Sequence, residues 1–315
     1  MTYYTLSVLA TVEAIGFVML FGVLSGFFSA FLQSSSYVLS RRFLLRSGNA
    51  AQLVVCSQFV MCLFGAATLA ATVPFVRFPA TWSWFGLLCL FVLFSNVGYF
   101  CFFRALREIE ASRLSSLLGL KIIVLAVVSM TILKQPVSGL QWAAVALSAV
   151  AAVGMNFTGG PLTRKGCLYL FLTLVAYAGA DTTETTMIQT MPGESLFANS
   201  LAVTGAAFTA LGLVSSVAFL RVRCSWKTVR AAVPYAIAWY SAMIFLFASF
   251  GAIGVLFGNI IQASRGLISI FLGLLLLRIG FDSLEPRVSR RAWIRRAIMA
   301  VFMLAAMALY SAARA

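Results

Sequence analysis

The sequence predicts an all-α integral membrane protein, from its composition and from the length of its apolar stretches. Of the 315 residues, 62% are hydrophobic and 10% are charged, and the mean hydropathy is +1.00. This composition leaves too little polar surface to cover a water-soluble globule. The apolar stretches are continuous and about 20 residues long, the length of a helix that crosses a bilayer. Because lipid offers backbone groups no hydrogen-bond partner, we expect these spans to be helical.

About ten such segments lie between clusters of charged residues. In chain order, we expect helices at Ile15–Val38, Ala51–Val73, Ser83–Phe103, Ser112–Ile132, Ser138–Phe157, Cys167–Gln189, Leu196–Phe219, Ala232–Gly251, Gly254–Leu277 and Trp293–Ala313. The longest stretch that is not apolar, Arg278–Arg296, is short enough to be a loop between two helices. We therefore predict no soluble domain.

The net charge of +15 could suggest a nucleic-acid partner, but the distribution of the basic residues indicates a membrane protein. They gather in the loops after the odd-numbered segments, at Arg41, Arg42, Arg46, Arg104, Arg107, Arg113, Arg164, Lys165, Arg221, Arg223, Lys227, Arg230, Arg278, Arg287, Arg290, Arg291, Arg295 and Arg296. The positive-inside rule then places these loops in the cytoplasm, provided that the count of ten is right. Membrane lipid, and no nucleic acid, is the expected partner.

Residue types that carry metal or covalent chemistry are scarce. The chain has no histidine, and its six cysteines form no CxxC pair, so we expect inert packing thiols and no metal site. A GxxxxGK[ST] phosphate loop and a nucleophile constellation are also missing. We therefore expect no cofactor, no enzymatic activity and no ATP-driven pumping.

The sequence contains an internal repeat. Residues 102–121 align without gaps on residues 246–265, a shift of 144 positions that places Lys121 on Arg265 and Asn96 on Tyr240. Each half then holds five segments, and an odd number per half gives the second half an inverted topology. We predict two inverted five-helix repeats, residues 1–160 and residues 161–315. Duplication makes a monomer sufficient and does not exclude a dimer.

The segment pattern, the repeat and two short stretches resemble the drug/metabolite transporter superfamily, specifically the ten-helix proteins of the EamA type. Residues 103–117 are similar to the family's short third connection, and residues 132–142 to its turn between helices four and five. That turn usually carries a glutamate where Gln135 stands, and a proline common early in helix four is replaced by Ile122. The resemblance implies alternating access around a central cavity in a multi-pass protein of the bacterial inner (plasma) membrane.

Two carboxylates, Asp181 and Glu184, lie three residues apart within an apolar segment. A charge at mid-bilayer costs about 3 kcal/mol or more, so such residues usually face a cavity, a partner charge or an ion. Tyr177 shares their helix face. The two carboxylates are expected to titrate separately and could hold a coupling proton that a cation displaces. Alternatively, the nearby threonines mark a solvated end of the span.

Lys121 and Arg265 are expected near the centres of the fourth and ninth segments, facing each other across the midplane. They could clamp a substrate carboxylate or phosphate, with Arg265 supplying a bidentate fork. Alternatively, each is the fixed ion-pair partner of Asp181 or Glu184.

The other candidate substrate-binding residues are polar or aromatic side chains within the spans: Gln33, Asn96, Tyr99, Tyr177, Trp239, Tyr240, Asn259 and Gln262. Gln33 belongs to a polar run that ends at Tyr37. Asn259 and Gln262 form a stripe with Arg265, although hydrogen bonds between helices would explain it equally well. Aromatic side chains suit organic cations and amino-acid side chains, but packing is their commoner role.

These features favour a secondary transporter, more readily an exporter, of small polar organic metabolites such as amino acids or related zwitterionic or cationic solutes. Asp181 and Glu184 would couple transport to protons. The alternatives are an exporter of lipophilic cations and a membrane subunit or lipid-handling factor that transports nothing.

Overall fold

The computed structural model describes residues 2–105, 107–109, 114, 117–155, 162–193, 195–219, 221–222, 224–265, 268, 271–272, 275 and 290–313. In these ranges all regular structure is helical. The elements are α1 (Thr2–Arg46), α2 (Ala50–Thr72), α3 (Trp82–Ala105), η1 (Leu118–Leu120), α5 (Lys121–Thr131), α6 (Gly139–Met155), α7 (Arg164–Gln189), α8 (Leu196–Phe219), α9 (Trp226–Ile253), α10 (Val255–Gln262) and α12 (Arg290–Ala312).

Five of the described helices are long and apolar enough to cross a membrane: α1 from Gly16 onward, α2, α3, α8 up to Val217, and α9. Shorter apolar helices occupy Leu118–Thr131, Gly139–Gly154 and Ala297–Ala312. Helix α7 has the length of a span, but its acidic and threonine-rich stretch makes it more polar. The chain is therefore all-helical with several membrane spans, and the total of about ten stays a prediction.

Side-chain caps explain where three of the helices begin. Asn49 and Gln52 form a capping box before α2: the Gln52 backbone N–H donates to Asn49 Oδ1 at 3.0 Å, and the Asn49 N–H donates to Gln52 Oε1 at 3.1 Å. Thr163 caps α7, and Ser225 caps α9. The cap at Ser225 starts α9 six residues before the predicted segment at Ala232. Capping satisfies backbone donors that the first turn of a helix leaves free.

A single residue, Gly254, separates α9 from α10. Its φ of 82° and ψ of 156° lie in a region that only glycine adopts without strain. Its N–H still donates to the Phe250 carbonyl at 2.9 Å, and its own carbonyl accepts the Gly258 N–H at 3.0 Å. The chain therefore turns directly from α9 into α10.

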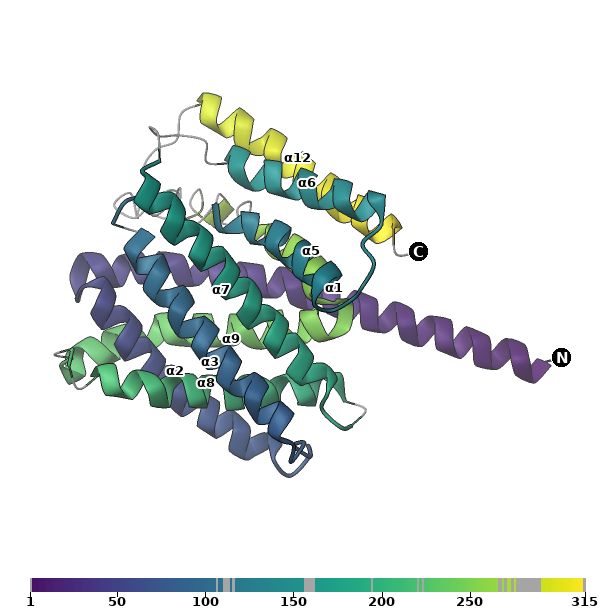
Figure 1. The fold of residues 1–315 in the computed structure, drawn as a ribbon, viewed down its shortest axis with the longest axis horizontal. Helices are drawn as coiled ribbons and strands as arrows, with labels where there is room; N and C mark the ends of the chain where they lie inside the picture. Colours follow the sequence, from purple (N-terminus) through teal and green to yellow (C-terminus); the bar gives the residue numbers. More distant parts are fainter. Residues whose placement is uncertain are drawn as a thin grey trace.

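The helices pack in pairs that join the two halves of the chain. Helix α1 packs against α9, α2 against α8, α3 against α7, and α6 against α12, while α10 contacts α5. Figure 1 shows α6 and α12 side by side along one edge and α1 extending beyond the bundle toward the N-terminus. The main interfaces thus lie between the halves, not within them.

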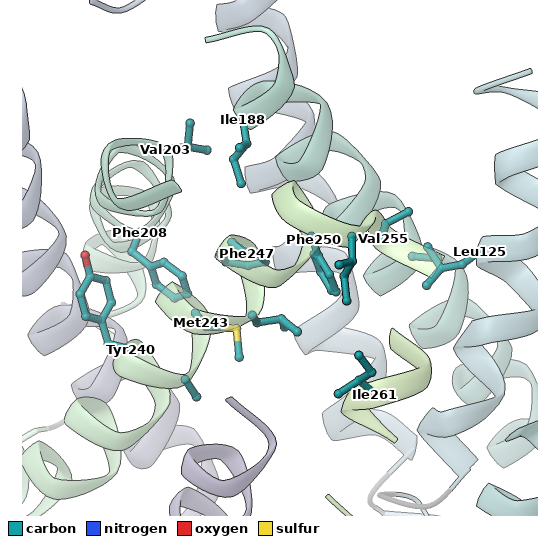
Figure 2. Packing of buried hydrophobic residues seen from close by; sticks show 14 of the residues in the cluster. Leu125, Ile188, Val203, Phe208, Tyr240, Met243, Phe247, Phe250, Val255 and Ile261 are labelled. Carbon is teal, nitrogen blue, oxygen red and sulfur yellow. The ribbon is translucent and has the colours of Figure 1, made fainter. Parts of the chain in front are cut away.

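An apolar cluster fills the space where these pairs meet (Figure 2). Leu125 of α5, Phe250 of α9 and Ile261 of α10 are almost completely buried in it. Phe208 and Tyr240 extend the cluster to the α8–α9 contact, with ring centroids 5.4 Å apart and the rings edge to face. Both halves of the chain contribute to this core.

Close backbone contact holds α2 against α8. A Cβ added at Gly65 would lie 2.9 Å from the Gly205 carbonyl oxygen and 2.9 Å from the Thr209 backbone nitrogen. Conversely, a Cβ at Gly205 would lie 2.9 Å from the Leu69 backbone nitrogen. Helices in lipid associate largely through such close packing, because lipid tails are as apolar as the helix surfaces.

We expect Gly65→Ala to lower the free energy of unfolding by about 1–3 kcal/mol, since the added methyl meets backbone that must move. Thermal unfolding in detergent measures this. Gly86→Ala is the matched control, because no atom lies within 4 Å of its added Cβ and alanine has the higher helix propensity. Equal melting temperatures for the two variants would contradict the close α2–α8 contact.

Candidate functional site

An ion pair connects α5 to α7 inside the bundle. Lys121 Nζ lies 2.5 Å from Asp181 Oδ2, and their side chains are 15% and 11% exposed. Asn259 of α10 donates to the same Asp181 oxygen at 3.1 Å and to the Val255 carbonyl at 2.9 Å. Asp181 is thereby held by helices from both halves of the chain. Of the two alternatives for Lys121, the structure therefore has the one in which Lys121 is the ion-pair partner of Asp181.

A second polar contact connects α1 to the residues after α10. Arg265 donates from a guanidinium NH₂ group to Gln33 Oε1 at 2.8 Å, and the Ser34 hydroxyl donates to the Arg265 carbonyl at 3.1 Å. Arg265 lies within electrostatic range of Lys121. Among the described side chains it has no carboxylate partner.

Glu184 lies one turn beyond Asp181 on α7 and is fully buried. Neither of its carboxylate oxygens has a hydrogen-bond partner among the described residues. Gln262 of α10, 3% exposed, likewise has an amide group without a partner there. Buried polar groups of this kind are costly and call for an explanation.

Aromatic side chains lie next to these polar groups. The rings of Tyr99 and Tyr177 are 6.0 Å apart, those of Tyr37 and Trp239 are 6.2 Å apart, and Tyr235 stacks on Trp239 at 6.0 Å. All five are half-buried. Tyr177 lies within electrostatic range of Arg265, and Tyr99 within range of Glu184. The structure thus brings α1, α3, α7 and α9 together around one aromatic group.

Tyr235 is the member of this group that the sequence reasoning missed. It follows Pro234, which lies inside α9 and inside the segment expected at Ala232–Gly251. The available signal was its spacing of four residues from Trp239, which places the two rings on one helix face.

Two predicted site residues are engaged elsewhere. Asn96 donates to the Val92 carbonyl of its own helix at 2.8 Å, so its amide satisfies α3 locally. Tyr240 packs between Phe64 and Phe208, although it remains within electrostatic range of Glu184. The two positions are equivalent in the repeat but have different surroundings.

Both cations follow an interruption of regular helix. The short 3₁₀ helix η1 immediately precedes Lys121, and a turn at Ala263–Ser264 immediately precedes Arg265. Their expected position near the centres of the fourth and ninth segments stays a prediction. A Cβ at Gly119 in η1 would lie 2.4 Å from Ala152 Cβ of α6. The close contact between η1 and α6 therefore requires glycine at this position. Such interruptions within apolar segments often mark functional sites.

An open surface groove lies apart from this polar group, between α2 and α9. It is lined by Phe59, Val60, Leu63, Phe64, Trp226, Val229, Arg230 and Val233. This lining is almost entirely apolar and contains none of the candidate residues. Among the described residues, no group of three or more His, Cys, Asp or Glu side chains could hold a metal ion.

The Lys121–Asp181 pair predicts non-additive effects of mutation. Lys121→Met or Asp181→Asn alone should lower the free energy of unfolding by about 3–5 kcal/mol, because each leaves an uncompensated buried charge or its unmet hydrogen bonds. The double variant should recover much of that loss. A double-mutant cycle from thermal unfolding in detergent measures the coupling, and simply additive losses would contradict the pairing.

The chain was compared with known proteins and structures. Residues 20–157 match the model of the EamA-like transporter family. No curated protein matches the chain. Among 28 matching chains of solved structures, one, described only as a crystal structure of a protein, is 16% identical, with a TM-score of 0.62 over 91% of this chain and 95% of that chain.

At 16% identity, the structural match shows a shared fold and nothing about function. The family match begins within the first predicted segment and extends over the other four segments of the first half of the chain. The chain is therefore a multi-pass helical membrane protein whose residues 20–157 are similar to the EamA-like transporter family.

Proposed function

We propose that the protein is a secondary transporter that works by alternating access around the polar group of Lys121, Asp181, Asn259, Arg265 and Gln33. Its substrates are small polar organic solutes such as amino acids or related zwitterionic or cationic metabolites, exported across a bacterial inner membrane. The observation that carries this proposal is that α5, α7 and α10 meet at Lys121, Asp181 and Asn259, while Gln33 of α1 contacts Arg265 just after α10. A site shared by both halves is what a rocking motion of the halves would open to either side in turn.

The proposal includes two inverted repeats, residues 1–160 and 161–315, each with five membrane helices. The pairing of helices supports it. In the proposed repeats, α1 corresponds to α7 and α3 corresponds to α9. Replacing each helix by its counterpart therefore turns the α1–α9 pair into the α7–α3 pair. The same exchange leaves the α2–α8, α5–α10 and α6–α12 pairs unchanged, and all of these pairs are observed. A two-fold axis between the repeats would produce this pattern.

The positions of the two cations support the same symmetry. The shift of 144 residues that places Lys121 on Arg265 also places η1, residues 118–120, on residues 262–264. The backbone departs from α-helix in both places. Broken helices at corresponding positions of two repeats are a feature of transporter binding sites, because they leave polar backbone and side chains free near mid-membrane.

The energetic cost of these residues also favours a functional role. Each charged residue at mid-membrane costs about 3 kcal/mol or more to insert, and buried ion pairs are often no more stabilising than apolar replacements of similar size. Five polar side chains at a helix junction therefore cannot be explained by stability alone.

Glu184 is the residue that we propose to carry the coupling proton. Asp181 is engaged by Lys121 and Asn259, whereas Glu184 is fully buried and its oxygens have no described partner. An ionised carboxylate is costly to bury unless it is paired or hydrogen-bonded. Glu184 is within electrostatic range of Asp181 and Tyr99. Its protonation or deprotonation would therefore change the electrostatic potential at the candidate substrate site.

The transport proposal predicts saturable counterflow of labelled solutes in proteoliposomes, tested with amino acids, polyamines and quaternary amines. A variant with Lys121→Gln, Asp181→Asn, Glu184→Gln and Arg265→Gln should lose at least 90% of the rate, an estimate based on the usual cost of removing binding groups. An Arg77→Gln/Glu108→Gln variant, changed at exposed positions, is the control. Equal rates for the neutralised variant and the wild type would refute the assigned roles.

The coupling proposal predicts that Glu184→Gln separates transport from the proton gradient. The variant cannot release a proton, so uptake driven by a pH gradient should fall to the background level while solute counterflow at equal pH persists. Glu108→Gln is the matched control, since Glu108 is an exposed carboxylate that accepts the Thr163 hydroxyl at 2.9 Å. If Glu184→Gln still responded to the gradient, the coupling proton would have to reside elsewhere.

A further inference from the structure

The two cations of the candidate site are paired unequally. Lys121 forms an ion pair with Asp181 at 2.5 Å, and the carboxylate oxygens of Glu184 have no hydrogen-bond partner among the described residues. The guanidinium of an arginine is cationic in proteins, and the only acceptor described for that of Arg265 is the uncharged Gln33 amide oxygen. Among the described residues of the site, Arg265 is therefore the cation without a carboxylate partner.

We propose that Arg265 binds the negatively charged group, a carboxylate or a phosphate, of an organic anion that the protein transports. This inference rests on the proposed transport function and changes its substrate class: it keeps solutes that carry a carboxylate, such as zwitterionic amino acids, adds organic anions and removes purely cationic solutes. Lys121, which would otherwise be an equal candidate, is already engaged by Asp181. The solute is thus recognised by its anionic end, and a purely cationic solute is disfavoured.

The surroundings of Arg265 hold it in position for such a ligand. Gln33 is 2% exposed. Its Oε1 atom accepts a hydrogen bond at 2.8 Å from one of the five N–H groups of the Arg265 guanidinium. The Ser34 hydroxyl fixes the Arg265 carbonyl at 3.1 Å. These contacts with α1 anchor both ends of the residue and leave guanidinium donors for a bidentate contact with an anion. A preoriented arginine loses less side-chain freedom on binding.

The aromatic side chains indicate the body of the solute. Tyr177 is within electrostatic range of Arg265, Tyr37 and Tyr235, and its ring lies 6.0 Å from that of Tyr99. Trp239 stacks on Tyr235. All of these rings are half-buried, so they keep surface that a ligand can contact. Rings favour offset or edge-to-face contact with another ring, which makes a planar aromatic body the best fit.

The test is counterflow of labelled 4-hydroxyphenylacetate in proteoliposomes containing the full chain. We expect saturable exchange by the wild type, and inhibition by unlabelled phenyl phosphate would show that the site accepts phosphate as well as carboxylate. Tyramine has the same ring with an amine in place of the carboxylate, so it should not compete. Arg265→Gln should lower the exchange rate at least tenfold, as expected for loss of a charge-assisted contact.

Two further variants make the result interpretable. Arg265→Lys keeps the charge but loses the fork, and it should retain part of the exchange and the preference for the anion. Arg77→Gln makes the same chemical change at an exposed position and should behave as wild type. If Arg265→Gln fails to fold, judged by gel filtration and thermal unfolding in detergent, the wild type and Arg265→Lys decide the matter by their anion preference.

The outcomes separate this inference from the transport proposal. Exchange of tyramine or polyamines without exchange of the two anions would overturn the inference and leave transport standing. Undiminished anion exchange by Arg265→Gln would also overturn it. Absence of exchange for every solute in both panels would overturn the transport proposal, and the substrate inference with it.

Discussion

The ion pair between Lys121 and Asp181 joins α5 to α7 within a bundle that offers charges almost no other compensation. Asn259 of α10 donates a hydrogen bond to the same carboxylate. The Asp181 side chain therefore connects three helices that come from both halves of the chain. In an apolar interior, the loss of either charged partner leaves a group that neither water nor lipid can satisfy. This constraint ties the position of α5 to that of α7 and leaves Arg265 as the cation that remains for a ligand.

The rest of the bundle is arranged so that the halves meet at compact, largely apolar contacts. Glycines 65 and 205 let α2 and α8 approach until their backbones touch, and each of the main helix pairs takes one member from each half. Motion between the halves would act on these interfaces and on the polar group at their centre. A conformational change and a binding event at this junction would therefore be coupled.

The two cations illustrate how similar sequence positions acquire different roles. Lys121 and Arg265 occupy corresponding positions in the proposed repeat, and each follows an interruption of helix. Only Lys121 meets a described carboxylate, because Asp181 lies on α7 beside α5, while α1 offers Arg265 the neutral Gln33. The two cations thus differ because α7 carries acidic residues where α1 carries neutral polar ones. Lys121 is paired with a carboxylate, and Arg265 is not.

The sequence alone determined the membrane class, the helical content and the family resemblance, because hydropathy and spacing are local properties. It did not single out Tyr235, and it did not show that Asn96 would bond to its own helix. It also left open which basic residue forms an ion pair with Asp181. Only the tertiary structure decided that choice, because the partner of a buried charge depends on which helices pack together, and helix packing in lipid follows from shape and close contact over the whole fold.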